Sequence, residues 1–207
     1  MLGWDVDRDA MTAPAVARNR DAVLAVLRRV LPARGTVLEI ASGSGEHAVY
    51  VAAALPALTW LPSDPDPEAR RSIAAHVRRA GATNILPPLD LDARAASWAV
   101  GRVDAIVCIN MIHIAPWAAT EGLMAGAGRI LTEDGLLFLY GPFREDGRHS
   151  ADSNADFDAS LRARDPDWGV RDREAVAVEA ARHGLTVSER VAMPANNLSL
   201  VVRRVRS

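Results

Sequence analysis

The feature that most constrains the fold is the stretch TVLEIASGSGEHAVYVAAALP, residues 36–56. An apolar, β-branched segment is followed by small residues and two glycines, and then by a run with helical character. Gly43 and Gly45 allow a tight turn and a close ligand, and the next helix offers unpaired N–H groups at its first turn. The stretch therefore predicts the start of a nucleotide-binding crevice.

The remaining chain continues the alternation of strands and helices. Apolar spacing predicts helices at residues 14–32, 46–55, 67–81, 117–131, 154–163 and 172–184. Apolar and β-branched runs predict strands at residues 36–40, 58–62, 84–89, 103–110, 135–141, 185–193 and 197–205. Two prolines weaken the strand at 84–89.

This order of elements predicts an α/β fold. Strands that alternate with helices form a parallel sheet through right-handed crossovers. The last two strands are joined only by PAN and must form an antiparallel hairpin. Five parallel strands and a terminal hairpin are the seven-stranded arrangement of the class I methyltransferase fold, which is Rossmann-like with helices on both faces.

Length and composition limit the class of protein. We expect 207 residues to form one domain, 1–207, with an N-terminal leader at 1–14 and a substrate-side insertion at 142–171. A net charge of −2 disfavours nucleic acid as the main partner. The one cysteine, Cys108, excludes a disulfide framework within the chain. The acidic N-terminus lacks signal-peptide features, and no apolar run approaches the roughly 20 residues that span a bilayer, which predicts a cytoplasmic protein.

Two cofactors compete for the glycine turn. The string GSGEHA fits a dinucleotide fingerprint with Ala48 as its third small residue, and Asp64 lies 19 residues after Gly45, where an acid holds a ribose. NAD is therefore one alternative. Glu39 favours S-adenosylmethionine (SAM), because a buried carboxylate needs a cationic or hydrogen-bonding partner and would repel a pyrophosphate. The terminal hairpin also fits methyltransferases better than dehydrogenases.

With these residues the chain resembles the SAM-dependent methyltransferases, where LEIASGSG matches a strand, an acid and a glycine-rich turn, with Ala41 in place of the first glycine. More narrowly, RNRDAVLAVL, LEIASGSGEHAVYVA, LPSDPD, INMIHIAPW, LLFLYGPFREDGRHSADSNADFDASLRARDPDWGVRD and MPANNLSLVVRR resemble the DUF938 proteins, also called methyltransferase-like 26. The resemblance covers nearly the whole chain. It implies a methyltransferase with SAM as cofactor, and no particular substrate.

The resemblance also implies which residues meet the methionine and ribose parts of SAM. Asp64 would accept hydrogen bonds from the ribose hydroxyls, with Asp66 as the alternative. The methionine part would meet Glu39, Ala41, Ser42, Gly43 and Gly45.

The adenine contacts are implied by the same resemblance. Asp90 would reach the adenine amine, unless it is a solvated loop acid, and Leu91 would cover the face of the ring. Asn110 and Met111 end the strand at 103–110, at the carboxyl edge where such folds bind ligands.

The chemistry predicts few catalytic groups. Methyl transfer from a sulfonium is an in-line displacement with an activated leaving group, so positioning supplies much of the catalysis and no metal is required. His113 is the candidate base if the acceptor must lose a proton, because it follows a central strand and imidazole titrates near neutrality. Alternatively, His113 orients its loop by hydrogen bonding. Tyr140 is a second catalytic candidate.

The acceptor is expected near the insertion, since polar loops of this length are often functional. Arg144 and Arg148 would bind an acidic acceptor or lie solvated, and Trp117 and Trp168 would wall an apolar pocket or pack in the core. The substrate-side candidates are Arg18, Asn19, His47, Trp117, Arg144, Arg148, His149 and Asn196.

A small molecule is the expected acceptor, with a protein or peptide as the next alternative. The chain has no NPPY-like tetrapeptide after the strand at 103–110, which argues against DNA methylation. Non-catalytic binding of SAM or S-adenosylhomocysteine (SAH), and a nicotinamide-dependent oxidoreductase, remain alternative functions. The sequence does not predict an oligomeric state.

Overall fold

A computed structural model describes residues 10–205. The chain divides into two compact units, with the boundary between Asp92 and Ala93, and each unit is described in turn. Most of the predicted leader lies outside the described residues.

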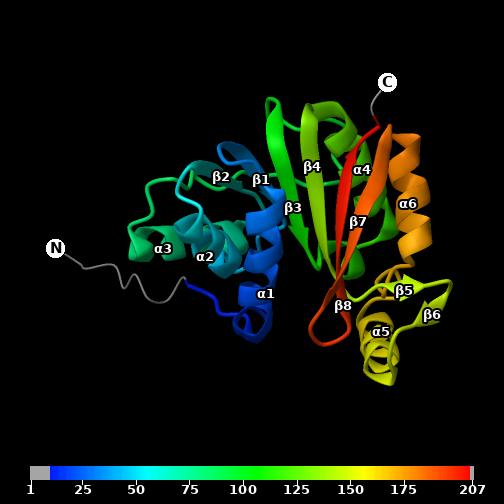
Figure 1. Ribbon diagram of the computed structural model, residues 1–207. Coiled ribbons are helices and arrows are strands. Elements are labelled where there is room, and N and C mark those ends of the chain that lie inside the picture. The colour runs from blue at the N-terminus through cyan, green and yellow to red at the C-terminus, as the bar shows by residue number, and fades with distance from the viewer. Residues whose placement is uncertain (1–9, 206–207) are drawn as a thin grey trace. The chain divides into compact units, whose positions relative to one another are not determined.

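The first unit pairs two parallel strands and packs helices against one another (Figure 1). β1 (Gly35–Ile40) pairs with β2 (Leu58–Pro62), with Leu38 opposite Leu61. The helices are α1 (Pro14–Val30), α2 (Glu46–Ala54) and α3 (Pro67–Ala80), and α2 packs against both α1 and α3. Gly81 caps α3 with φ of 61°. These elements confirm the sequence predictions for residues 14–81.

The predicted strand at 84–89 is wrong. This segment pairs with β2 at one isolated bridge, Trp60 to Ile85, and with the residue after β2 at another, Ser63 to Leu89. Pro87 and Pro88 lie between the two contacts and have no N–H to donate, so a continuous ladder cannot form.

The second unit contains four strands in the order β3-β4-β8-β7. Their bounds are Val103–Ile109 for β3, Leu131–Gly141 for β4, Leu185–Met193 for β7 and Asn197–Arg204 for β8. β3 and β4 are parallel, β8 is antiparallel to β4, and β7 is antiparallel to β8. The predicted terminal hairpin is confirmed. The predicted seven strands are corrected to six long ones within residues 10–205, because the segment at 84–89 forms none.

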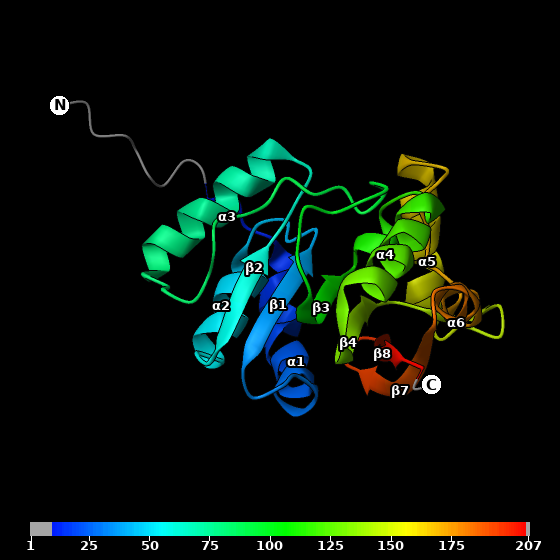
Figure 2. The same ribbon diagram turned by 90° about the horizontal axis from the view of Figure 1, so that it is seen from above.

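Two helices cover one face of these strands, α4 (Trp117–Ile130) and α6 (Arg173–Arg182), and they pack against each other (Figure 2). The glycines of α4, which lower its helix propensity, have a packing reason. A Cβ on Gly122 would lie 2.2 Å from the carbonyl oxygen of Ala93, and one on Gly126 would lie 2.3 Å from the ring of Trp98. Side chains at these positions would prevent this close approach.

The insertion contains α5 (Asp152–Arg164), close to the predicted helix at 154–163, and a short hairpin of β5 (Arg144–Glu145) and β6 (Arg148–His149) beside it (Figure 1). The hairpin was not predicted, because two-residue strands are too short to show alternation. The sequence does contain a signal for it. Asp146 and Gly147 have φ of 49° and 71°, as the Asp-Gly pair of a tight hairpin turn requires.

Candidate functional site

The two glycines of the turn between β1 and α2 have different structural roles. Gly45 has φ of 88°, and a Cβ there would lie 2.7 Å from Cα of Ile73 in α3. Gly43 has φ of 57°, and a Cβ there would meet no atom within 4 Å. Gly45 therefore allows α3 to approach, whereas Gly43 faces open space where a ligand has room.

Three backbone N–H groups of this turn donate to other groups of the chain. The Ser42 N–H donates to the Ser63 carbonyl over 2.8 Å, and the Gly45 N–H donates to the Ser42 carbonyl over 3.1 Å. The Gly43 N–H donates to the Asp64 carboxylate over 3.0 Å. Glu46 adds a carboxylate in the first turn of α2. A diphosphate needs free N–H donors and is repelled by carboxylates, so the turn suits a cationic ligand better.

Asp64 follows β2 and lies directly beside the turn. Its Oδ2 accepts the Gly43 N–H and its Oδ1 accepts the Asp66 N–H, both over 3.0 Å. Burial raises the pKa of Asp64 above its ordinary value. Asp66 instead caps α3 by accepting the Glu68 N–H over 2.8 Å. This division favours Asp64 over Asp66 as a ribose ligand, which stays a prediction.

Glu39 is buried in β1 with an exposed fraction of 2%. Its Oε2 accepts a hydrogen bond of 2.9 Å from Trp60 Nε1 in β2. Burial raises the pKa of Glu39 to about 7 despite this bond. Trp60 is thus one partner of the kind that a buried carboxylate requires. A contact of Glu39 with the methionine part of SAM stays a prediction.

Of the other predicted cofactor residues in the first unit, Ser42 and Leu91 are buried. Asp90 is exposed and pairs with Arg70 over 3.1 Å. Arg70 Nη1 also donates to the Asp64 carbonyl over 2.8 Å. Arg70 was missed from the sequence, although its place in the first turns of α3 after LPSDPD brings it to this edge.

The substrate-side candidates of the first unit form one pair. His47 Nε2 lies 2.8 Å from Asn19 Oδ1, and both residues are buried. Burial lowers the pKa of His47 to about 4, so the imidazole is neutral at neutral pH. The pair links α1 to α2, while Arg18 lies exposed on α1.

In the second unit, Asn110 and Met111 follow β3 at its carboxyl end, as predicted. Asn110 has φ of 63°, a left-handed angle that asparagine tolerates, and its N–H donates to the Tyr140 carbonyl over 2.8 Å. Met111 is buried and begins a 3-10 helix, η1 (Met111–His113). Their contact with a cofactor stays a prediction.

His113 is fully buried at the end of η1. Its Nδ1 accepts the N–H of Arg171 over 3.2 Å, and its ring packs edge-on against Phe143 with 4.8 Å between centroids. Burial, together with the charge of Arg171, lowers the pKa of His113 to about 3. The nitrogen that would accept a proton is therefore occupied, which favours the loop-orienting role of His113 over that of a base.

Arg171 holds the loop that contains His113, and sequence reasoning missed it. Its guanidinium donates to the carbonyls of Ile112, Ala115 and Asp167 over 2.8, 2.6 and 2.7 Å, respectively. It also lies 5.8 Å from the ring centroid of Trp117. A single arginine in a polar insertion gives no sequence signal for such contacts.

The remaining aromatic candidates lie in packed surroundings. Tyr140 is buried in β4. The guanidinium of Arg164 lies over the ring of Trp168, 5.3 Å from its centroid, and the guanidinium of Arg171 lies over the ring of Trp117. Both tryptophans thus stack with arginines, and an apolar pocket between them stays a prediction.

The tip of the terminal hairpin reaches the insertion. The Asn196 carbonyl accepts a hydrogen bond of 2.9 Å from Asn154 Nδ2 in α5. Within the insertion, Arg144 and His149 are direct partners across β5 and β6, while Arg148 is exposed. The structure therefore brings together three predicted acceptor-side residues, Arg144, His149 and Asn196, in one part of the second unit.

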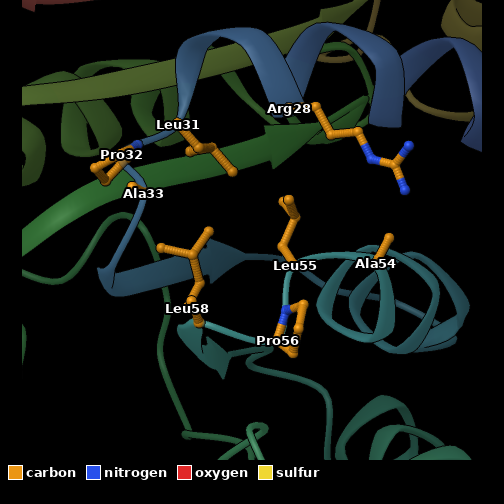
Figure 3. Close-up of a pocket in the computed structure, with 9 residues that line it drawn as sticks. Arg28, Leu31, Pro32, Ala33, Ala54, Leu55, Pro56 and Leu58 are labelled. Atoms are coloured by element: carbon orange, nitrogen blue, oxygen red, sulfur yellow. The ribbon is translucent and has the colours of Figure 1, made fainter.

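A pocket of about 300 Å³ lies at the other end of β1 and β2, away from the glycine turn (Figure 3). It is formed by the segments that precede these two strands. In Figure 3, Arg28 is the charged side chain among apolar neighbours that include Leu31, Leu55 and Leu58. Ligands of open α/β sheets bind at the carboxyl ends of the strands, so this pocket is not the candidate site.

Residues 10–205 contain neither a metal-binding cluster nor a helix that could span a membrane. These residues contain no cluster of three or more His, Cys, Asp or Glu side chains arranged to hold a metal ion. The same part of the chain has no helix with the length and hydropathy needed to cross a membrane.

Solved methyltransferases share this fold at low sequence identity. A putative O-methyltransferase from Nostoc punctiforme matches with a TM-score of 0.80 and 16% identity, over 95% of this chain and 59% of that one. The mitomycin 7-O-methyltransferase matches with a TM-score of 0.78 and 15% identity, over 92% of this chain and 54% of that one. An SAH-bound methyltransferase of calicheamicin biosynthesis matches with a TM-score of 0.73 and 16% identity, over 92% of this chain and 54% of that one. The fold is therefore the Rossmann-like α/β fold of class I methyltransferases, and this chain spans less than two thirds of the length of these proteins.

The chain belongs to the DUF938 family, described as proteins of unknown function, whose model matches residues 10–204. This match confirms the family resemblance drawn from the sequence motifs. The label methyltransferase-like 26 stays a prediction.

Proposed function

We propose that this chain is a SAM-dependent methyltransferase that acts on a small-molecule acceptor. The observation that carries the proposal is the acid-lined glycine turn. Three of its N–H groups are engaged, the carboxylates of Asp64 and Glu46 lie beside it, and Gly43 faces open space. A ligand with an ammonium and a sulfonium suits this setting, and when bound it supplies an activated methyl group.

The names of the solved structures support the same function. One is a 7-O-methyltransferase of mitomycin, and another belongs to calicheamicin biosynthesis and was solved with SAH. In this chain, Asp64 would accept hydrogen bonds from the ribose hydroxyls. Glu39 and the glycine turn would bind the ammonium group of the methionine part. Asp90 and Leu91 would contact the adenine. We likewise propose Asn110 and Met111 in the second unit as cofactor contacts.

Isothermal titration calorimetry with SAM, SAH and NAD tests the proposal. We expect SAM and SAH to bind and Asp64→Ala to weaken SAM binding about 10- to 100-fold, because a charge-assisted hydrogen bond contributes roughly 1.5–3 kcal/mol. Asp156→Ala is the matched control, since it removes the same charge from an exposed position of α5. Binding of NAD alone would overturn the proposal.

Catalysis is tested separately with methyl-labelled SAM and the small-molecule fraction of a cell extract. Transfer of label by the wild type, and its loss in Asp64→Ala, supports an enzyme. Binding of SAM without transfer to any acceptor pool would instead favour the non-catalytic binding module.

A further inference from the structure

The pocket at the amino ends of β1 and β2 has an accessible apolar wall. Residues 31–33 follow α1 on one side, and residues 54–58 connect α2 to β2 on the other, all within the first unit. The side chains of Leu31, Leu55 and Leu58 face the same space (Figure 3). Every lining residue except Leu58 is at least partly exposed. An apolar group that enters from solvent can therefore be buried here.

The backbone of this wall is fixed before any ligand arrives. Asn84 Nδ2 donates to the carbonyls of Ala52 and Leu58, both over 3.0 Å. The Leu58 N–H donates to the Leu55 carbonyl over 3.0 Å. Two lining residues are prolines, which have no N–H at all. The wall is thus pre-formed and largely apolar, as ligand pockets usually are, and its specificity depends on the few polar side chains at its edge.

Arg28 is the charged side chain among the lining residues. The positions three and four residues before and after it are all apolar, so no acidic neighbour on the helix can pair with it. Asp21, the acid within α1, already accepts a hydrogen bond from the Tyr50 hydroxyl. Among residues 10–205 no carboxylate pairs with the Arg28 guanidinium. A cation next to an apolar wall fits an anionic group on an apolar body.

The helix ends limit the charge of such a ligand. Both α1 and α2 end at the pocket, and a helix carries about half a negative charge at its carboxyl end. One guanidinium outweighs either helix end and balances one full negative charge. A doubly charged phosphate would leave a second charge uncompensated beside these helix ends. The pocket therefore favours a single carboxylate.

The volume limits the size of the ligand. The pocket measures about 300 Å³. A water molecule takes about 30 Å³ in the liquid, so the pocket has room for about ten non-hydrogen atoms. This is the lower end of the range for small-molecule pockets.

We propose that this pocket binds a small monocarboxylate with an apolar chain or ring, of the size of octanoate or phenylacetate. The carboxylate accepts hydrogen bonds from Arg28, and the apolar body packs against Leu31, Leu55 and Leu58. The site lies at the ends of β1 and β2 opposite the glycine turn, and the inference does not depend on the proposed methyltransferase function.

Isothermal titration calorimetry of the full chain with octanoate, 1-octanol and octylammonium tests the ligand class. We expect octanoate to bind with a Kd between about 10 µM and 1 mM, the range for a ligand of this size. The alcohol and the ammonium share its chain and should bind about 10-fold more weakly or less, because neither pairs with a guanidinium. Equal affinity for 1-octanol, tighter binding of octylammonium, or no binding of octanoate at about 10 mM overturns the inference.

Variants assign the binding to this pocket. Arg28→Gln should lower octanoate affinity about 10-fold or more, because the charge-assisted hydrogen bonds are lost. Arg29→Gln is the matched control: it removes the same charge from the next exposed position of α1, outside the lining, and should change affinity less than about threefold. Ala54→Phe places a ring in the pocket from a half-buried helix end and should abolish binding. Unchanged affinity in Arg28→Gln overturns the inference.

A competition experiment separates this site from the proposed cofactor site. Octanoate should bind equally well with and without saturating SAH, since the pocket and the glycine turn lie at opposite ends of the same strands. Displacement of octanoate by SAH would place it at the glycine turn and contradict the inference. If SAH itself does not bind, the proposed methyltransferase function fails, and Arg28→Gln still decides for or against the carboxylate site.

Discussion

Ala41 shows at the scale of one residue how a backbone angle shapes the candidate site. It follows β1 with φ of 54°, a left-handed angle that residues other than glycine seldom adopt. An L-residue pays roughly 1–2 kcal/mol for this conformation, because its Cβ crowds the next carbonyl oxygen. The turn is therefore reached at a cost in folding free energy.

Replacing this residue is expected to recover part of the cost. Ala41→Gly should raise the free energy of unfolding by about 0.5–1 kcal/mol, since the strain removed exceeds the entropy that glycine loses. Chemical denaturation measures the change, and SAM affinity should persist. Ala41→Val, with its branched side chain, should destabilise the protein instead. A glycine variant less stable than the wild type would contradict the strain at this position.

Glu39 makes stability depend on pH. Its folded pKa of about 7 lies above the ordinary 4.5, so its contribution to stability is fully present below pH 4.5 and is lost as the pH rises through 7. Glu39→Gln should therefore be more stable than the wild type above pH 7, by at most about 3 kcal/mol, with the gain shrinking toward pH 4.5. Thermal denaturation across this range, without ligand, measures the difference.

A carboxyl at the surface provides the comparison for this pH profile. Glu121→Gln removes an exposed carboxyl of α4 and should follow the wild-type curve. A pH-independent difference between Glu39→Gln and the wild type would mean that the buried carboxyl titrates alike in the folded and unfolded chain.

At the scale of elements, β4 and η1 are fitted together at Gly141. A Cβ on Gly141 would lie 2.4 Å from His113 Nε2, so the imidazole occupies the space that a side chain at the end of β4 would need. The loop is held from the other side by the N–H of Arg171 on Nδ1. The position of His113 thus depends on the absence of a side chain in a neighbouring strand.

A double-mutant cycle tests this contact. Gly141→Ala should lower the free energy of unfolding by about 1–3 kcal/mol through overpacking, whereas Gly101→Ala, where a Cβ meets no atom within 4 Å, should change it by less than about 0.5 kcal/mol. In a His113→Ala background the cost of Gly141→Ala should fall, with a coupling of at least about 1 kcal/mol. Additive effects would show that the ring does not restrict this position.

At the scale of the whole molecule, ligand binding should appear as a shift of the unfolding temperature. SAH at about 100 times its Kd stabilises a protein by about 2.7 kcal/mol, which corresponds to roughly 5–10 °C for a chain of this length. Differential scanning calorimetry measures the shift. Asp64→Ala should reduce it at the same SAH concentration and Asp156→Ala should not. No shift with saturating SAH would count against the cofactor assignment.

Sequence reasoning succeeded where local patterns decide structure. Apolar spacing located the helices from α1 to α6, and the short PAN connection required the terminal antiparallel hairpin. It failed at 84–89, where strand-like apolar residues flank two prolines that cannot donate to a ladder. It also missed the β5–β6 hairpin, whose strands are shorter than the alternation that reveals a strand.

The candidate site divides in the same way between sequence and structure. By itself, the sequence determined the glycine turn, the acids around it and the family, because these are residue types at fixed spacings along the chain. Only the tertiary structure decided that His113 is enclosed, with its Nδ1 occupied by the N–H of Arg171, and that Asp158 lies 3.4 Å from His149. Burial and partners far along the chain set the proton-accepting capacity of an imidazole, and neither can be read from the residues next to it.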